Sequence, residues 1–376
     1  MLRRFVWVLA ALVALFIATE IAGFLGLIPH LQPVSWRGLL ENPLFAIGFG
    51  GPLLLHLSSL PRWRELAVTA ILGIALALLV GNWVLGLGLA STAVLAVRRD
   101  WLFLLPSLIT LFFTLEVAMF LGVVSHIAPL TYDGLAYLAD ASLGAPVSFV
   151  IGRLFRDVPI VAAVCTAIYL APPPGLIFVY ALQVRAKRPP RVDIVTTLVA
   201  MGVAGYALYW LFPVCGPKFA FPSFFPGQLP VVEPGSLIPV ATAPRNGVPS
   251  LHMASALIAF IHARRHGRIA GGVAMVFVIG TLLATMGTGE HYFVDLAVAV
   301  PFTFALEFLL QRRVGAAVPS VALFFVWLYA LRFHAHVSAA MWTLVLATAV
   351  LAALDFRRVD EGTTKRDGTV AAPALR

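Results

Sequence analysis

The feature that most constrains this chain is a succession of long apolar segments separated by short polar ones. Apolar runs long enough to cross a bilayer as helices, roughly 17–25 residues each, recur along the whole sequence. Of the 376 residues, 61% are hydrophobic and only 11% are charged, whereas a soluble domain is about half apolar and a quarter charged. The pattern therefore predicts an all-α, polytopic membrane protein.

The apolar runs predict where the chain crosses the membrane. The first run follows Arg3 and Arg4 and lacks a clear cleavage site, which favours a retained span over a signal peptide. The run at 66–97 is long enough for one tilted span or a hairpin. The predicted spans are 5–28, 43–59, 66–97, 102–126, 149–170, 174–187, 193–213, 249–264, 270–287, 292–310, 316–333 and 338–354.

Positive charges gather in some polar connections and are sparse in others. Lys and Arg cluster at 185–191, 264–268, 312–313 and 357–358, which predicts that these segments are cytoplasmic. This distribution accounts for the formal net charge of +9 without a nucleic-acid partner. The N-terminus, with Arg3 and Arg4, and the C-terminal tail are both basic and are therefore both predicted to be cytoplasmic. Two ends on the same side require an even number of spans, and we expect about twelve. With that count the segment RRD (98–100) falls outside, against the rule.

A histidine and a carboxylate open one predicted helix on the non-cytoplasmic side. In GTGEHYFVD, His291 and Asp295 are four residues apart, which places them on one helix face. The carboxylate can hold one ring nitrogen and leave the other free to attack. A carboxylate in a membrane helix is costly without a partner, so it indicates a functional site. A structural hydrogen bond between helices is the alternative.

A second histidine opens another helix at the same membrane level, in VPSLH (248–252). Pro249 suits the first helical turn, and the free N–H groups around Ser250 form an anion site. His252 beside them can protonate a departing oxygen, although a histidine at a helix mouth is more often simply interfacial.

The segment before this helix, 214–248, contains two positive side chains, Lys218 in GPKF and Arg245 in APRNG. Arginine binds phosphate oxygens with two donors and lysine acts as a point charge. We expect both to bind a phosphate, with attraction to lipid headgroups as the alternative. His262 and His266 in HARRHGR could bind a metal from one helix face, but the surrounding arginines predict a solvated cytoplasmic face.

VPSLH followed by HYFVD resembles the second and third signature motifs of the type 2 phosphatidic-acid phosphatase superfamily, Pro-Ser-x-His and His-x-x-x-Asp. The resemblance covers residues 130–312 and implies a catalytic six-helix membrane core there. The other predicted parts are N-terminal transmembrane helices in 1–129, two additional transmembrane helices in 313–355, and a disordered cytoplasmic tail in 356–376.

The resemblance also implies roles. His291 is expected to form a phosphohistidine, Asp295 to orient it, and His252 to act as the general acid. Lys218, Arg245 and Ser250 are expected to bind the substrate phosphate, with no metal and no cofactor.

The sequence departs from the family's pattern in two places. The first motif, Lys-x6-Arg-Pro, has no match, so Lys218 is expected to take over its role. Ala284 and Thr285 stand where a Ser-Arg pair usually precedes the third motif. This variant is similar to the inositol phosphorylceramide synthase branch.

The predicted function is a metal-independent lipid phosphatase or phosphotransferase that acts on a lipid phosphate among membrane lipids. The predicted location is the periplasmic or extracellular face of a bacterial plasma membrane. Headgroup transfer between lipids, as in inositol phosphorylceramide synthases, is one alternative. A proton-coupled transporter is another, although the sequence has no obvious internal repeat. A third is a hydrolase in which the two histidines and Asp295 ligate a metal.

Overall fold

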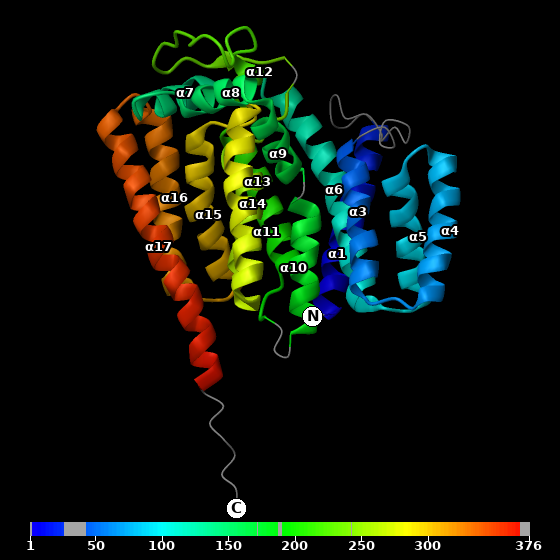
Figure 1. Ribbon diagram of the computed structural model, residues 1–376. Helices are drawn as coiled ribbons and strands as arrows, with labels where there is room; N and C mark the ends of the chain where they lie inside the picture. Colours follow the sequence, from blue (N-terminus) through cyan, green and yellow to red (C-terminus); the bar gives the residue numbers. More distant parts are fainter. Residues whose placement is uncertain (1, 26–42, 171, 187–189, 242, 369–376) are drawn as a thin grey trace, which may run out of the picture.

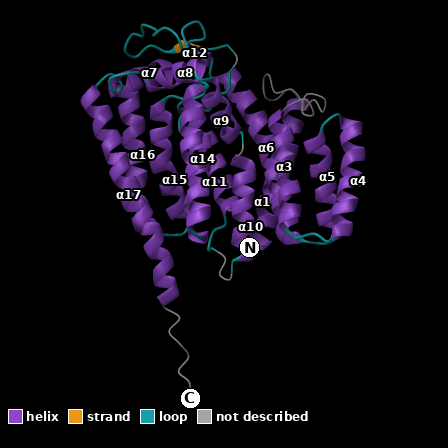
Figure 2. Ribbon diagram, in the orientation of Figure 1, coloured by secondary structure: helices purple, strands orange, loops and turns teal. Residues whose placement is uncertain are grey.

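The computed structural model describes residues 2–25, 43–170, 172–186, 190–241 and 243–368. Within these ranges the chain is almost entirely helical (Figure 2). The strand pairing in the described residues joins β1 (Leu130–Thr131) to β2 (Ile238–Pro239) in antiparallel register. The all-α class expected from the sequence is therefore confirmed.

The N-terminal helices form a layer beside the rest of the bundle (Figure 1). Gly81, with φ at +70°, and Asn82, whose side chain accepts from the Leu85 N–H at 3.1 Å, reverse the chain between two of them. The segment 66–97 is therefore a hairpin. The helices are α1 (Leu2–Phe24), α3 (Pro43–Ser58), α4 (Trp63–Val80), α5 (Trp83–Val97) and α6 (Trp101–Ile127).

The central part of the chain is a helical bundle with two helices lying across one end (Figure 1). These are α7 (Asp133–Ser142) and α8 (Val147–Asp157), and the chain bends by 87° between them. The bundle helices are α9 (Pro159–Tyr169), α10 (Pro172–Arg185), α11 (Ile194–Leu211), α13 (Leu251–Ala263), α14 (Arg268–Gly287) and α15 (Phe293–Leu310). Two short helices, α12 (Pro217–Ala220) and η1 (Arg264–His266), lie in the connections.

The predicted span 149–170 is not one helix. Helix α8 ends at Asp157, and Pro159 starts α9. A proline removes a backbone donor and disfavours the helical conformation of the residue before it, so the chain breaks at this point.

Seven helices of the described residues are long and apolar enough to cross a membrane, or up to eight if α7 and α8 count as one broken span. The chain is therefore an integral, multi-pass membrane protein. The expected total of about twelve spans and the six-helix core stay predictions, because helices such as α5, α9 and α10 are shorter than a full span.

Two helices, α16 (Val314–His334) and α17 (Ser338–Gly368), complete the bundle. Residues 356–368 are helical where the sequence predicted a disordered tail, while 369–376 lie outside the described residues. Phe356 packs on the rings of Phe260 and Phe304, with centroids 5.3 and 4.9 Å apart. These aromatic contacts hold the start of this segment against the bundle, which the sequence pattern did not reveal.

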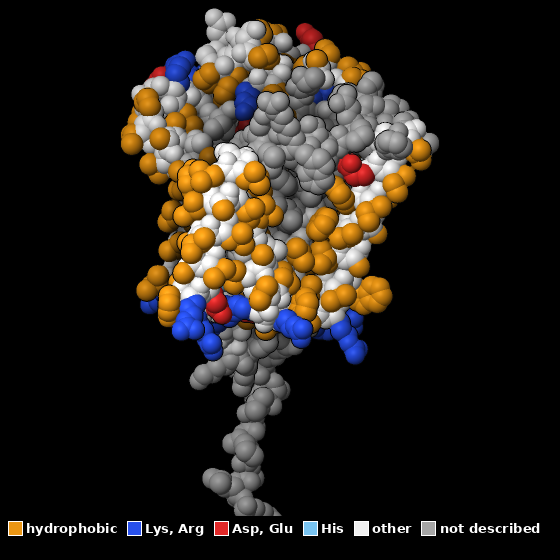
Figure 3. All heavy atoms as spheres, turned by 90° about the vertical axis from the view of Figure 1, so that its right-hand side faces the viewer, with side chains coloured by type: hydrophobic (Ala, Val, Ile, Leu, Met, Phe, Trp, Pro, Cys, Tyr) orange, Lys and Arg blue, Asp and Glu red, His pale blue; other side chains and the backbone are white. Residues whose placement is uncertain are grey.

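The basic clusters gather at one end of the bundle, here called the basic end. Arg185 donates to the Ser58 carbonyl, and Arg98 donates to the Ser59 hydroxyl at 3.1 Å. The segment 98–100 therefore lies at the same end as the cluster 185–191, because the hairpin α4–α5 brings it there. Figure 3 shows Lys and Arg side chains gathered below a band of hydrophobic side chains.

A buried polar network lies toward the basic end, between α13 and α15. His262 Nε2 is 3.2 Å from Glu307 Oε2, and His262 Nδ1 is 2.6 Å from the Gln183 amide nitrogen. His262 and Glu307 are fully buried, so the expected solvated face for His262 is wrong. Breaking a buried pair leaves an uncompensated polar group, and the network therefore fixes how α13 and α15 sit against each other.

The basic end predicts which side of the membrane each loop occupies. Val231, in the loop at the opposite end, is 95% exposed, and Arg268 is exposed at the basic end. In intact cells, a membrane-impermeant maleimide should label Val231→Cys and should label Arg268→Cys only after the cells are opened. The native cysteines, Cys165 and Cys215, are buried and give little background. The reverse labelling pattern would show that the orientation is inverted.

Candidate active site

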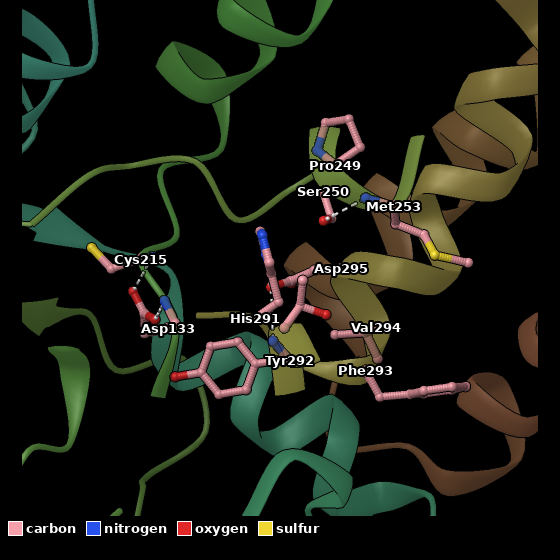
Figure 4. Close-up of polar contacts among 12 residues, drawn as sticks. Asp133, Cys215, Pro249, Ser250, Met253, His291, Tyr292, Phe293, Val294 and Asp295 are labelled. Carbon is pink, nitrogen blue, oxygen red and sulfur yellow. Dashed lines mark hydrogen bonds and ion pairs between the residues drawn. The ribbon is translucent and has the colours of Figure 1, made fainter. Parts of the chain in front are cut away.

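The two histidine motifs meet at the end of the bundle opposite the basic end. VPSLH leads into α13 and HYFVD leads into α15, and the first turns of both helices lie together there (Figure 4). The Ser250 N–H donates to the carbonyl oxygen of Asp295 at 3.3 Å, which joins the motifs directly. The imidazole rings of His252 and His291 have centroids 6.1 Å apart. Two segments about forty residues apart in the chain thus form one site.

His291 lies in the turn before α15, and Asp295 lies in the first turn of that helix. His291 Nδ1 is 3.4 Å from Asp295 Oδ2, which also accepts from the Tyr292 N–H at 2.9 Å (Figure 4). His291 Nε2 and Asp295 Oδ1 are buried and form no hydrogen bond with another side chain or backbone group of the described residues. The Gly247 backbone lies close enough to the imidazole to favour its charged form. Desolvation lowers the pKa of His291 to about 4, so its imidazole is neutral near pH 7. A neutral ring has one nitrogen lone pair available for attack.

His252 occupies the first turn of α13 and is partly buried. Besides facing His291, its ring packs against the ring of Tyr169 on α9, and the two ring centroids are 4.5 Å apart. The Ser250 hydroxyl accepts from the Met253 N–H at 3.3 Å and so caps the helix. The sequence did not identify Tyr169 as a residue of the site, because nothing near it distinguishes it from the other aromatic residues of apolar helices.

Two glycines let the segment that carries Lys218 pack against the turn before His291. Gly216 has φ at +108°, and a Cβ there would lie 2.1 Å from the Glu290 carbonyl oxygen. Gly289 has φ at +74°, and a Cβ there would lie 2.8 Å from Lys218 Cβ. Residues with side chains rarely adopt such angles, so both positions require glycine. The Lys218 N–H donates to the Gly289 carbonyl at 3.1 Å.

Lys218 Nζ forms an ion pair with Glu290, the residue before His291. The Lys218 side chain is 35% exposed, and that of Glu290 is 19% exposed. Glu290 was not among the site residues predicted from the sequence, although an acidic residue directly before the third motif was a visible signal. The structure places Lys218 beside the site, and phosphate binding by this residue stays a prediction.

Arg245 is fully buried and its guanidinium faces backbone carbonyls. It donates to the carbonyl oxygens of Ala128, Val240 and Ala243 at 3.0, 2.6 and 2.6 Å. These three bonds hold the long connection between α11 and α13 against the end of α6. Phosphate binding by Arg245 stays a prediction. In the described residues its guanidinium binds backbone carbonyls of the loop and of the end of α6.

Helix α7 supplies two fully buried carboxylates, which are not among the site residues predicted from the sequence. Asp133 accepts from the N–H groups of Cys215 and Gly216 at 3.0 and 2.8 Å (Figure 4). Asp140 accepts from the first two N–H groups of α15, both at 3.0 Å. The two aspartates are seven residues apart, about two helical turns, so they share one face. That spacing in YDGLAYLAD indicates a shared helix face, although it does not show which N–H groups the two carboxylates accept from.

No three His, Cys, Asp or Glu side chains of the described residues are arranged to hold a metal ion. The set His252, His291 and Asp295, which the metal-hydrolase alternative would need, does not form such a group. The charged and polar groups of the site instead contact one another and the backbone.

Residues 136–309 match the family model described as the PAP2 superfamily, and this range contains both histidine motifs and Lys218. It lies within the core predicted at 130–312. No curated protein and no solved structure matches the chain. The likeness to inositol phosphorylceramide synthases stays a prediction. Residues 136–309 therefore form a domain of the PAP2 superfamily, that of the type 2 phosphatidic-acid phosphatases.

Proposed function

We propose that the protein is a membrane enzyme that transfers the phosphoryl group of a lipid phosphate through a phosphohistidine at His291. The observation that carries the proposal is the pair of imidazoles 6.1 Å apart, with a carboxylate beside one of them. Membership of the PAP2 superfamily supports activity of the phosphatase or phosphotransferase type.

In the first step, His291 Nε2 attacks phosphorus with its lone pair, and the bond from phosphorus to the lipid oxygen breaks. Asp295 holds Nδ1–H and stabilises the positive charge that develops on the ring. His252, once it has taken up a proton beside the bound phosphate, gives that proton to the departing oxygen. The products are a lipid alcohol and a phosphohistidine.

In the second step, the hydroxyl of an acceptor attacks phosphorus, gives its proton to His252, and displaces His291. Water as acceptor releases phosphate, and a lipid alcohol as acceptor yields a new phospholipid. The headgroup transferases are therefore the nearest alternative within the same chemistry.

The phosphate oxygens need donors and positive charge in both steps. Lys218 has an ammonium group with three donors, so it can hold Glu290 and a phosphate oxygen together. The first-turn N–H groups of α13, after Ser250, point toward the start of the helix, where an anion is favoured. Arg245 supports the loop that carries these groups.

We place the reaction at the outer leaflet of a bacterial plasma membrane. The site lies at the end of the bundle opposite the basic clusters, which the positive-inside rule assigns to the cytoplasm. The labelling of Val231→Cys and Arg268→Cys tests this assignment.

An assay of lipid phosphates in detergent micelles tests the reaction itself. We expect the purified protein to consume a lipid phosphate, because the site holds a nucleophile, its orienting carboxylate and a general acid. Released phosphate and lipid products are measured in the same reaction, with and without an added lipid alcohol. Phosphate release without a new lipid shows a phosphatase, and a new phospholipid shows a transferase. No turnover of any lipid phosphate or phosphodiester would contradict the proposal.

The two histidines should separate kinetically. His291→Ala should abolish turnover of every substrate, because no phosphoenzyme forms. His252→Ala should lose on the order of a hundred- to ten-thousandfold with alkyl esters and much less with a p-nitrophenyl ester, whose leaving group needs no proton. His334→Ala, at an exposed position at the same end of the bundle, is the matched control and should stay active. An equal loss with both esters would rule out His252 as the acid.

Asp295 should act through His291 and not as a metal ligand. Asp295→Asn keeps the shape but can leave the wrong tautomer facing the phosphate, so kcat should fall on the order of a hundred- to ten-thousandfold with KM little changed. Asp355→Asn changes another buried carboxylate, on α17, and should retain activity. Wild-type turnover should be indifferent to EDTA. Loss of activity in EDTA with recovery on added zinc would overturn the phosphohistidine mechanism.

A further inference from the structure

Resting on the proposed function, we infer that α7 is a two-armed support in which Asp140 positions the attacking pair and Asp133 positions Lys218. Neither carboxylate touches the reacting atoms in the proposed mechanism. Both are positioning residues, and each is expected to control a different kinetic constant.

The first arm acts on the start of α15. Asp140 Oδ2 accepts from the Phe293 N–H and Asp140 Oδ1 from the Val294 N–H. The first N–H groups of a helix have no partner inside the helix, and a carboxylate is favoured at that positive end. The preceding N–H, of Tyr292, is taken by Asp295 itself. Three consecutive backbone donors are thus fixed by two carboxylates, and this arrangement sets where the Asp295 side chain stands under His291.

The second arm acts on the connection before α12. Asp133 Oδ2 accepts from the Cys215 N–H and Asp133 Oδ1 from the Gly216 N–H. Gly216 directly precedes α12, and Lys218 follows two residues later. Because a Cβ at Gly216 would lie only 2.1 Å from the Glu290 carbonyl oxygen, the two backbone segments are in close contact and have little freedom to shift there. Holding Gly216 therefore holds the ammonium group beside the site.

One short helix joins the arms. Asp133 and Asp140 are both fully buried and share one face of α7, and α7 lies across the end where α15 begins (Figure 1). A catalytic constellation must be held to about half an ångström by the residues around it. Support from one rigid element fixes the nucleophile and the phosphate-binding cation relative to each other, which neither loop could do alone.

The variants Asp140→Asn and Asp133→Asn test the two arms in the full-length protein. An asparagine keeps one acceptor oxygen and turns an amide donor against a backbone N–H, so each arm loosens without a change of size. Asp140→Asn should lower kcat and the rate of phosphohistidine formation on the order of tenfold to a hundredfold, with KM nearly unchanged. Asp133→Asn should raise KM about tenfold with a smaller effect on kcat.

Asp193→Asn is the matched control. Asp193 is also a buried carboxylate that caps a helix, α11, where it accepts from the Thr196 N–H at 2.9 Å. It lies toward the basic end, beside Arg4. A purely structural role for α7 predicts that all three variants lower the yield of folded protein and leave both constants of the folded enzyme unchanged. That outcome would overturn the proposal, as would equal effects of the two α7 variants on the same constant.

Charge-preserving variants and a measurement without substrate complete the test. Asp140→Glu should recover part of the lost kcat, and Asp133→Glu should bring KM part of the way back to the wild-type value. These two variants replace the asparagine variants in the test if the latter fail to fold. Hydrogen exchange should accelerate at Phe293 and Val294 only when Asp140 is changed, and at Cys215 and Gly216 only when Asp133 is changed. Unaltered exchange at these amides would overturn the anchoring. If the wild type transfers no phosphoryl group at all, the proposed function fails, and the exchange pattern still decides whether α7 anchors both segments.

Discussion

The hydrogen bond from the Ser250 N–H to the Asp295 carbonyl joins the starts of α13 and α15, and the rest of the site depends on that junction. It brings His252, in the first turn of one helix, to face His291, just before the other. The same two helices are joined again toward the basic end, through His262 and its buried carboxylate partner. Two parallel helices fixed at both ends cannot slide, so the spacing of the imidazoles is a property of the bundle and not of the loops.

The sequence could predict this junction because the chemistry was concentrated in two short motifs. Histidine and aspartate four residues apart must share a helix face, and the alternation of basic loops put both motifs at one level. The membrane character and the all-α class followed from apolar length alone. The same criterion failed at 149–170, because Pro159 divides this segment into two helices, α8 and α9, with different directions (Figure 1). A different prediction failed at His262. Its neighbouring arginines indicated a solvated face, but its side chain turns inward to the buried Glu307.

The supporting groups could not be predicted, because their partners are backbone N–H and carbonyl groups that no sequence pattern displays. Asp133 and Asp140 read as two ordinary acidic residues until the structure shows which N–H groups they accept from. Arg245 shows the converse. Its charge suggested a phosphate ligand, yet three carbonyl oxygens already surround the guanidinium. The residue type therefore indicates a charged group at each of these positions. Only the fold shows whether that group is directed to a substrate or to backbone groups of the protein itself.

The charge balance of the site follows from the same distinction. With the Arg245 guanidinium turned to the backbone, Lys218 is the cation that the structure sets beside the histidines, and Glu290 already neutralises it. Under the proposed function, a phosphate that binds there meets a carboxylate as well as an ammonium group, so Lys218 would contact both anions at once. Its three donors allow this, but the arrangement works only if Nζ stays between the two anions. The backbone that carries Lys218 must then be rigid, which explains why close glycine packing and a buried carboxylate meet at Gly216.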